Sequence, residues 1–157
     1  MNYTKEIGRL LSEKNLTIST TESCTGGLLS SKLTDISGSS SYITLNLVTY
    51  ANQAKNKMLN VSSKTLSDKG AVSEECAFEM AKGLYELTGS DICVSTTGIA
   101  GPTGGSKEKP VGLMFSTIYT KEKHKTYKIL KDSNTPRIEM KELFVTEVLK
   151  NIYEFLN

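Results

Sequence analysis

Apolar residues recur along the chain with two periods, one typical of amphipathic helices and one typical of short strands. Tyr3, Ile7 and Leu10 follow helical spacing, and the stretch 16–21 after them is rich in β-branched residues. The chain is therefore expected to begin with a helix and continue into a strand.

The same alternation of patterns continues to the end of the chain. Ser73 followed by two glutamates makes a helix N-terminus, and Pro136 after Thr135 makes another, with Thr135 as the expected cap. The remaining patterns predict helices over 25–36 and 74–88, a helix that starts in 51–58 and a helix from 136 onward. They also predict strands over 43–50, 92–97, 111–119 and 126–130.

Helices that alternate with strands favour an α/β fold. We expect a three-layer α/β/α sandwich with a mixed, mainly parallel sheet, in which the last two strands run antiparallel. No linker or internal repeat interrupts the pattern, so one domain over residues 1–157 is expected.

Composition is that of a globular domain, with 38% hydrophobic and 23% charged residues. The chain has no apolar stretch of transmembrane length, and its start lacks the layout of a secretory signal. We therefore expect a cytoplasmic protein without a membrane partner.

Basic residues are scattered except for one stretch, in which lysine occupies positions 121, 123, 125, 128 and 131. Lysines of this kind are common on exposed hairpins and edge strands. Without interleaved aromatic residues or a known module, they do not favour nucleic-acid binding.

Metal and histidine chemistry receive little support. The three cysteines are widely separated and the chain has one histidine, so no metal site, disulfide framework or cofactor is expected. Catalysis by a Ser-His-Asp triad is equally disfavoured, and a hydrolytic serine would need another base.

Two loops rich in small residues each follow an expected strand, namely 22–27 and 97–106. Ligands of α/β sheets bind at the carboxyl ends of strands, where backbone amides face the ligand. Neither loop matches a P-loop, a dinucleotide fingerprint or a nucleophile elbow. A glycine-rich loop alone is often only a tight turn, but two at strand ends favour a shared site.

Lys55 is the best candidate for the missing base, because it follows the strand that ends at Tyr50. A lysine can accept a proton only where burial or nearby positive charge lowers its pKa. Alternatively, Lys55 is a solvent-exposed lysine on a helix surface, which is the commoner environment for this residue type.

Seven segments combine into a pattern that resembles the C-terminal domain of CinA proteins. They are TESCTGG (21–27), GSS (38–40), VTY (48–50) with AK (54–55), GAVS (70–73), TGIAGP (97–102), GGS (104–106) and KPVG (109–112). The resemblance extends from about Leu10 to the end, and the family includes stand-alone nicotinamide mononucleotide amidohydrolases.

The resemblance implies hydrolysis of nicotinamide mononucleotide to nicotinic acid mononucleotide and ammonia by a metal-free serine-lysine mechanism, in a homodimer or higher homo-oligomer. The implied catalytic residues are Ser23, Ser40, Tyr50 and Lys55. The implied substrate-binding residues are Thr25, Gly26, Gly27, Thr97, Gly98, Gly101, Gly104, Gly105 and Arg137. Thr103 departs from the aspartate or glycine of many relatives, so polar contacts there are expected to differ.

Two questions stay open at this level. Strand direction puts Ser23 at the carboxyl edge of the sheet and Ser40 at the opposite edge, which favours Ser23 as nucleophile unless the segment bends or a second subunit supplies Ser40. The alternative function is a catalytically weak nucleotide-binding domain that regulates competence or a DNA damage response. A third candidate is an amidohydrolase of another small amide.

Overall fold

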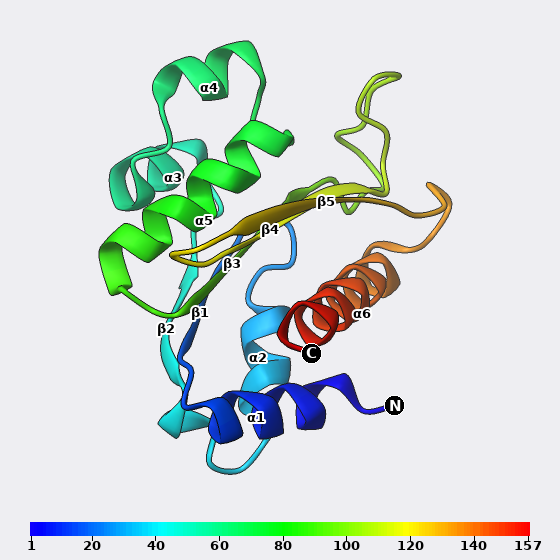
Figure 1. Cartoon of the computed structure of the whole chain (residues 1–157). Coiled ribbons are helices and arrows are strands. Elements are labelled where there is room, and N and C mark those ends of the chain that lie inside the picture. The colour runs from blue at the N-terminus through cyan, green and yellow to red at the C-terminus, as the bar shows by residue number, and fades with distance from the viewer.

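A five-stranded sheet organises the chain in this computed structural model, which describes all residues 1–157 (Figure 1). The strand order across the sheet is β2-β1-β3-β4-β5. The strands are β1 (Ile18–Glu22), β2 (Ile43–Val48), β3 (Ile92–Gly98), β4 (Leu113–Tyr119) and β5 (His124–Leu130).

Strand β1 pairs in parallel with both β2 and β3, whereas β4 pairs antiparallel with β3 and with β5. Strand β4 thus runs against the other four, and the prediction of a mixed, mainly parallel sheet is confirmed. Because β1, β2 and β3 share one direction, the segments that follow Glu22, Val48 and Gly98 meet at one edge of the sheet.

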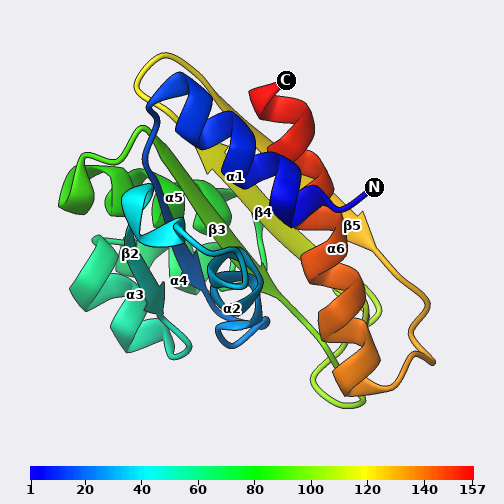
Figure 2. The same cartoon turned by 90° about the horizontal axis from the view of Figure 1, so that it is seen from below.

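Helices cover both faces, as Figures 1 and 2 show, so the three-layer prediction is also confirmed. One face carries α1 (Tyr3–Lys14), α2 (Leu28–Thr34) and α6 (Arg137–Leu156). The other carries α3 (Asn52–Leu59), α4 (Ser63–Asp68) and α5 (Glu74–Thr88). A short 3₁₀ helix, η1 (Ser39–Ser41), leads into β2.

The largest core cluster lies between the sheet and the layer of α1, α2 and α6, where Ile7, Met114 and Phe144 are fully buried. A smaller cluster packs under α5 around Met80 and Leu84. Burial of this apolar surface is the main force that holds the two helical layers on the sheet.

The N-termini of α5 and α6 test the two caps that the sequence predicts. The Ser73 hydroxyl caps α5 by accepting from the Cys76 N–H, as its position before the glutamates predicts. For α6 the expected Thr135 cap is wrong, because Pro136 occupies the N-cap position and Thr135 closes a turn onto Asp132. None of the helices is both long and apolar enough to span a bilayer.

Candidate active site

Ser23 and Lys55 form a buried pair at the carboxyl edge of the sheet. The Lys55 Nζ lies 3.1 Å from the Ser23 Oγ and donates to the Tyr50 carbonyl oxygen at 2.9 Å. Ser23 follows the end of β1, whereas Lys55 lies on the first turn of α3 after β2. Parallel pairing of β1 with β2 therefore brings together two residues that are 32 positions apart.

Burial alters the acid-base chemistry of Lys55. The side chain is only 1% exposed, and no carboxylate pairs with it. Removal from water lowers the pKa of the Lys55 ammonium below its ordinary value, because the charged form loses hydration. A lysine in this environment can supply a neutral amine to a hydroxyl in contact with it.

A cavity of 230 Å³ opens beside Ser23, and Lys55 lies next to Ser23 without lining the cavity itself. Ser23 and Cys24 of the first loop line it, together with Tyr50 from the end of β2. The other lining residues come from the second loop and from α6, and are Gly98, Ile99, Ala100, Gly101, Thr103, Gly104 and Arg137. Both glycine-rich loops expected at strand ends therefore contribute to one site.

Arg137, the first residue of α6, holds two walls of this cavity together. Its guanidinium donates to the Gly101 carbonyl oxygen at 2.7 Å and to the Tyr50 hydroxyl at 3.1 Å. The side chain thus places a permanent positive charge at the rim, next to a tyrosine that is 57% exposed.

Glu22 is a site residue for which the sequence suggested no role. Its fully buried carboxylate accepts from the Thr25 hydroxyl, from the N–H groups of Leu29 and Ser30, and from the Ser30 hydroxyl. These bonds fix the loop that carries Ser23 against α2. The sequence feature that could have indicated this role is the position of Glu22 at the end of a buried strand, because a buried carboxylate needs hydrogen-bond donors around it.

Five of the expected binding residues do not line the cavity. Thr25 bonds to Glu22 and to the Thr96 hydroxyl, and Thr97 donates to the Ala71 carbonyl oxygen. The structure thus gives these two hydroxyls partners within the protein. Gly26, Gly27 and Gly105 likewise do not line the 230 Å³ cavity.

Ser40 lies at the opposite end of the strands from Ser23 and Lys55. It sits in η1, directly before β2, and β2 starts opposite Ile18 at the beginning of β1. Ser23 and Lys55 follow the ends of those strands, so the whole length of β2 separates Ser40 from them. The side chain is exposed and makes no hydrogen bond within the chain.

Cys24 neighbours Ser23 but is a poor nucleophile. Burial, with the Glu22 charge as a smaller contribution, raises the pKa of the Cys24 thiol to about 12. The protonated thiol is therefore the form present near neutral pH. No group of three or more histidine, cysteine or acidic side chains is arranged to hold a metal ion.

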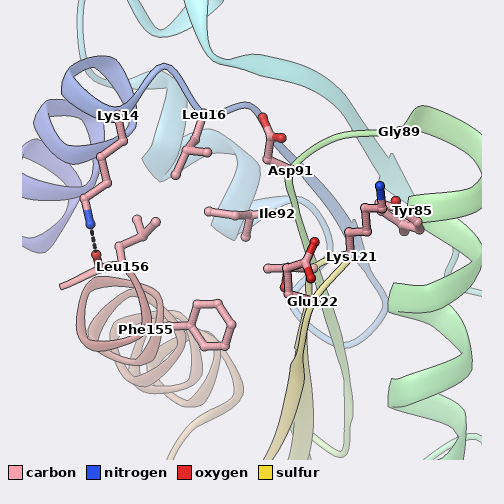
Figure 3. Close-up of a pocket in the computed structure, with 11 residues that line it drawn as sticks. Lys14, Leu16, Tyr85, Gly89, Asp91, Ile92, Lys121, Glu122, Phe155 and Leu156 are labelled. Atoms are coloured by element: carbon pink, nitrogen blue, oxygen red, sulfur yellow. Dashed lines mark hydrogen bonds between the residues drawn. The ribbon is translucent and has the colours of Figure 1, made fainter.

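A larger cavity of 470 Å³ lies at the opposite edge of the sheet, between the C-terminal ends of α1, α5 and α6 (Figure 3). Two of its four charged residues, Lys14 and Asp91, already have structural partners. Lys14 donates to the Leu156 carbonyl oxygen at the end of α6, and Asp91 accepts from Thr17. We therefore place the chemistry at the Ser23 cavity.

Comparison with known proteins gives a consistent picture. The model of the CinA C-terminal domain matches residues 1–156. A CinA-like protein of Chloroherpeton thalassium is 47% identical over 159 residues, which cover 100% of this chain and 38% of that protein. The chain spans about a third of the length of such relatives.

Solved structures share the whole fold. A competence/damage inducible protein, CihA, from Agrobacterium tumefaciens matches with a TM-score of 0.93 and 35% identity, covering 100% of this chain and 97% of that one. A CinA superfamily protein from Klebsiella pneumoniae matches with a TM-score of 0.93 and 28% identity, covering 98% and 95%.

Proposed function

Because the chain belongs to the CinA C-terminal domain family, we propose that it hydrolyses the carboxamide of nicotinamide mononucleotide, with Ser23 as nucleophile and Lys55 as general base. The products are nicotinic acid mononucleotide and ammonia. The observation that carries this proposal is the 3.1 Å contact between the Ser23 hydroxyl and a buried lysine amine.

In the first step, neutral Lys55 accepts the proton of the Ser23 hydroxyl while the oxygen attacks the carboxamide carbon. The carbonyl oxygen becomes an oxyanion. The N–H groups of Ala100, Gly101 and Gly104 make no hydrogen bond within the protein and belong to the cavity wall. Such free donors can stabilise the charge as it develops.

In the second step, the Lys55 ammonium returns its proton to the amide nitrogen, and the carbon-nitrogen bond breaks to release ammonia. A nicotinoyl ester remains on Ser23. Water then attacks this ester with Lys55 again as base, which restores the Ser23 hydroxyl and releases the acid. The net reaction consumes one water for each ammonia released.

Arg137 supports a substrate that carries phosphate. Two of its N–H groups already hold Gly101 and Tyr50, which fixes the planar guanidinium at the rim of the cavity. A fixed guanidinium forms strong charge-assisted bonds with phosphate oxygens. The cavity is smaller than the ~300–1,000 Å³ typical of sites that enclose drug-sized ligands. The nicotinamide ring would occupy it, and the phosphate would extend to the rim.

Incubation of the purified protein with nicotinamide mononucleotide, followed by assays of ammonia and nicotinic acid mononucleotide, tests the proposal. Equal amounts of both products are expected. Nicotinamide riboside, which lacks the phosphate, should react with a higher KM. Binding of the nucleotide without ammonia release would instead support the regulatory domain, and turnover of other small amides alone would support the third candidate.

A further inference from the structure

The second glycine-rich loop has a supporting segment, residues 106–111, behind the residues that form the cavity wall. A Cβ atom at Gly101 would come within 2.3 Å of the Val111 side chain, and one at Gly105 within 2.7 Å of the Val111 backbone nitrogen. The Ser106 N–H donates to the Lys109 carbonyl oxygen at 2.8 Å, which closes a turn within the segment. Because such close contacts transmit displacements, the position of this segment determines where the cavity wall lies.

The Lys109 side chain ties the supporting segment to the connection between α4 and α5. Its Nζ donates to the carbonyl oxygen of Lys69, the C-cap residue of α4. No carboxylate lies within 4 Å of the Lys109 Nζ, and the side chain is half-buried. The carbonyl end of a helix favours a cation, so the ammonium has a stable position there.

A second bond joins the same connection to the chain before the cavity wall. The Thr97 hydroxyl, near the end of β3, donates to the Ala71 carbonyl oxygen at 2.8 Å. Residues 69–71 therefore hold the second glycine-rich loop on both sides of the cavity wall. From the opposite face of the sheet, Arg137 holds the wall itself through the Gly101 carbonyl oxygen.

We propose that Lys109 is a positioning residue, which anchors the second glycine-rich loop to residues 69–71 and thereby fixes the free N–H groups of the cavity wall. Lys109 does not line the cavity and acts only through the backbone of the loop. Donors stabilise an oxyanion when they are held in place before the reaction, and a displacement of about 1 Å can cost about 10²-fold in rate. The effect on the reaction rests on the proposed function, whereas the anchoring does not.

Lys107 supplies a matched control. It lies two residues earlier in the same loop, is exposed and makes no hydrogen bond or ion pair within the chain. Lys107→Met and Lys109→Met remove the same charge, but only the second removes the anchor. Any loss that comes from weaker attraction of an anionic substrate should therefore appear in both variants.

Hydrogen exchange measures the anchoring without reference to activity. The N–H groups of Ser106 and Gly112 are bonded within the loop, the second to the Ile99 carbonyl oxygen. Both should exchange about 10-fold faster in Lys109→Met, because the loop opens more easily without its bond to a charged group. Lys107→Met should keep the wild-type rates. Equal rates in Lys109→Met and wild type would overturn the anchoring.

Steady-state ammonia release from nicotinamide mononucleotide tests the effect on the reaction. Lys109→Met should lower kcat by about 10- to 100-fold and leave KM within about twofold of the wild-type value, because the donors act in the transition state. Lys107→Met should match the wild type in both constants. Lys109→Arg keeps a charged donor on a long side chain and should recover part of the lost kcat.

Wild-type kcat in Lys109→Met, or a raised KM with normal kcat, would overturn the positioning role. If the wild type itself releases no ammonia, the proposed function fails, and the exchange rates still decide whether Lys109 anchors the loop.

Discussion

Burial of the Lys55 ammonium destabilises the folded protein, but it also lowers the pKa of the group that acts as base in the proposed reaction. A buried ammonium without a carboxylate partner loses hydration that its hydrogen bonds to Ser23 and Tyr50 only partly replace. Proteins retain such groups where the perturbed pKa serves a reaction. The residue is thus expected to be destabilising and yet required for turnover.

Lys55→Met should separate these two effects, because methionine fills a similar volume without a charge. We expect kcat to fall by about 10²- to 10⁴-fold and the free energy of unfolding to rise by about 1–3 kcal/mol at neutral pH. Ammonia release and urea denaturation measure the two quantities. Near-normal turnover, or a clear loss of stability, would be inconsistent with these roles.

The stability difference should depend on pH in a defined direction. Burial lowers the folded-state pKa of Lys55, so the unfolded chain binds more protons between that pKa and the ordinary value of 10.5. The penalty is complete below the lowered pKa and disappears as pH rises past the ordinary one. The gap between wild type and Lys55→Met should therefore narrow as pH increases, whereas a constant gap would argue against a buried charge.

Arg137→Ala should weaken substrate binding more than chemistry. Its guanidinium lies at the rim and does not contact Ser23 or Lys55. Loss of a charge-assisted phosphate contact of about 1.5–3 kcal/mol predicts a KM about 10- to 100-fold higher. Ile138→Ala, at an 81% exposed neighbour, is the control and should behave as wild type. An effect on kcat alone would contradict the binding role.

Sequence reasoning could identify Ser23 and Lys55 because each follows a recognisable strand and histidine chemistry was excluded. It could not assign Glu22, whose four bonds depend on how α2 packs against the first loop. It also could not show that Thr97 turns away to Ala71. The direction of a side chain at a strand end depends on the local twist, which residue type does not specify.

At the scale of elements, the contact between α3 and α5 sets the position of Lys55. Gly83 in the middle of α5 lies against the C-terminal end of α3, where a Cβ atom would come within 1.9 Å of the Leu59 carbonyl oxygen. Absence of a side chain therefore lets the two helices approach closely. The sequence alone gives the opposite impression, because glycine inside a helix is normally unfavourable.

Gly83→Ala tests this contact. Helix propensity would predict a gain of about 0.5–1 kcal/mol, but the steric conflict with rigid backbone predicts a loss of about 1–3 kcal/mol or more. Lys82→Ala, at the exposed neighbouring position, should have little effect on the midpoint of denaturation. A more stable Gly83→Ala protein would show that α3 and α5 can separate without cost.

Element patterns were largely readable from the chain. The helical period of α1, the Ser73 cap of α5 and the strands of the sheet follow local rules. The sequence pattern did not predict α4. Its six residues include no buried apolar residue, so they show no helical hydrophobic period. The start of α6 was displaced because Thr135 is used by the preceding turn.

For the whole molecule, the parallel pairing of β1 with β2 and β3 is the feature that creates the site. It gathers Ser23, Lys55 and the second glycine-rich loop at one edge from three separate parts of the chain. The same pairing places Ser40 at the opposite end of the strands, as the strand direction predicts.

Single-turnover ammonia release from nicotinamide mononucleotide, compared between Ser23→Ala and Ser40→Ala with enzyme in excess, tests the assignment of Ser23 as nucleophile most directly. Ser23→Ala should bind the nucleotide but release no ammonia above the rate of Lys55→Met. Ser40→Ala should still release ammonia at a reduced rate, because its Ser23–Lys55 pair is intact. Chemistry that survives in Ser23→Ala and is lost in Ser40→Ala, with binding retained in both, would contradict the account.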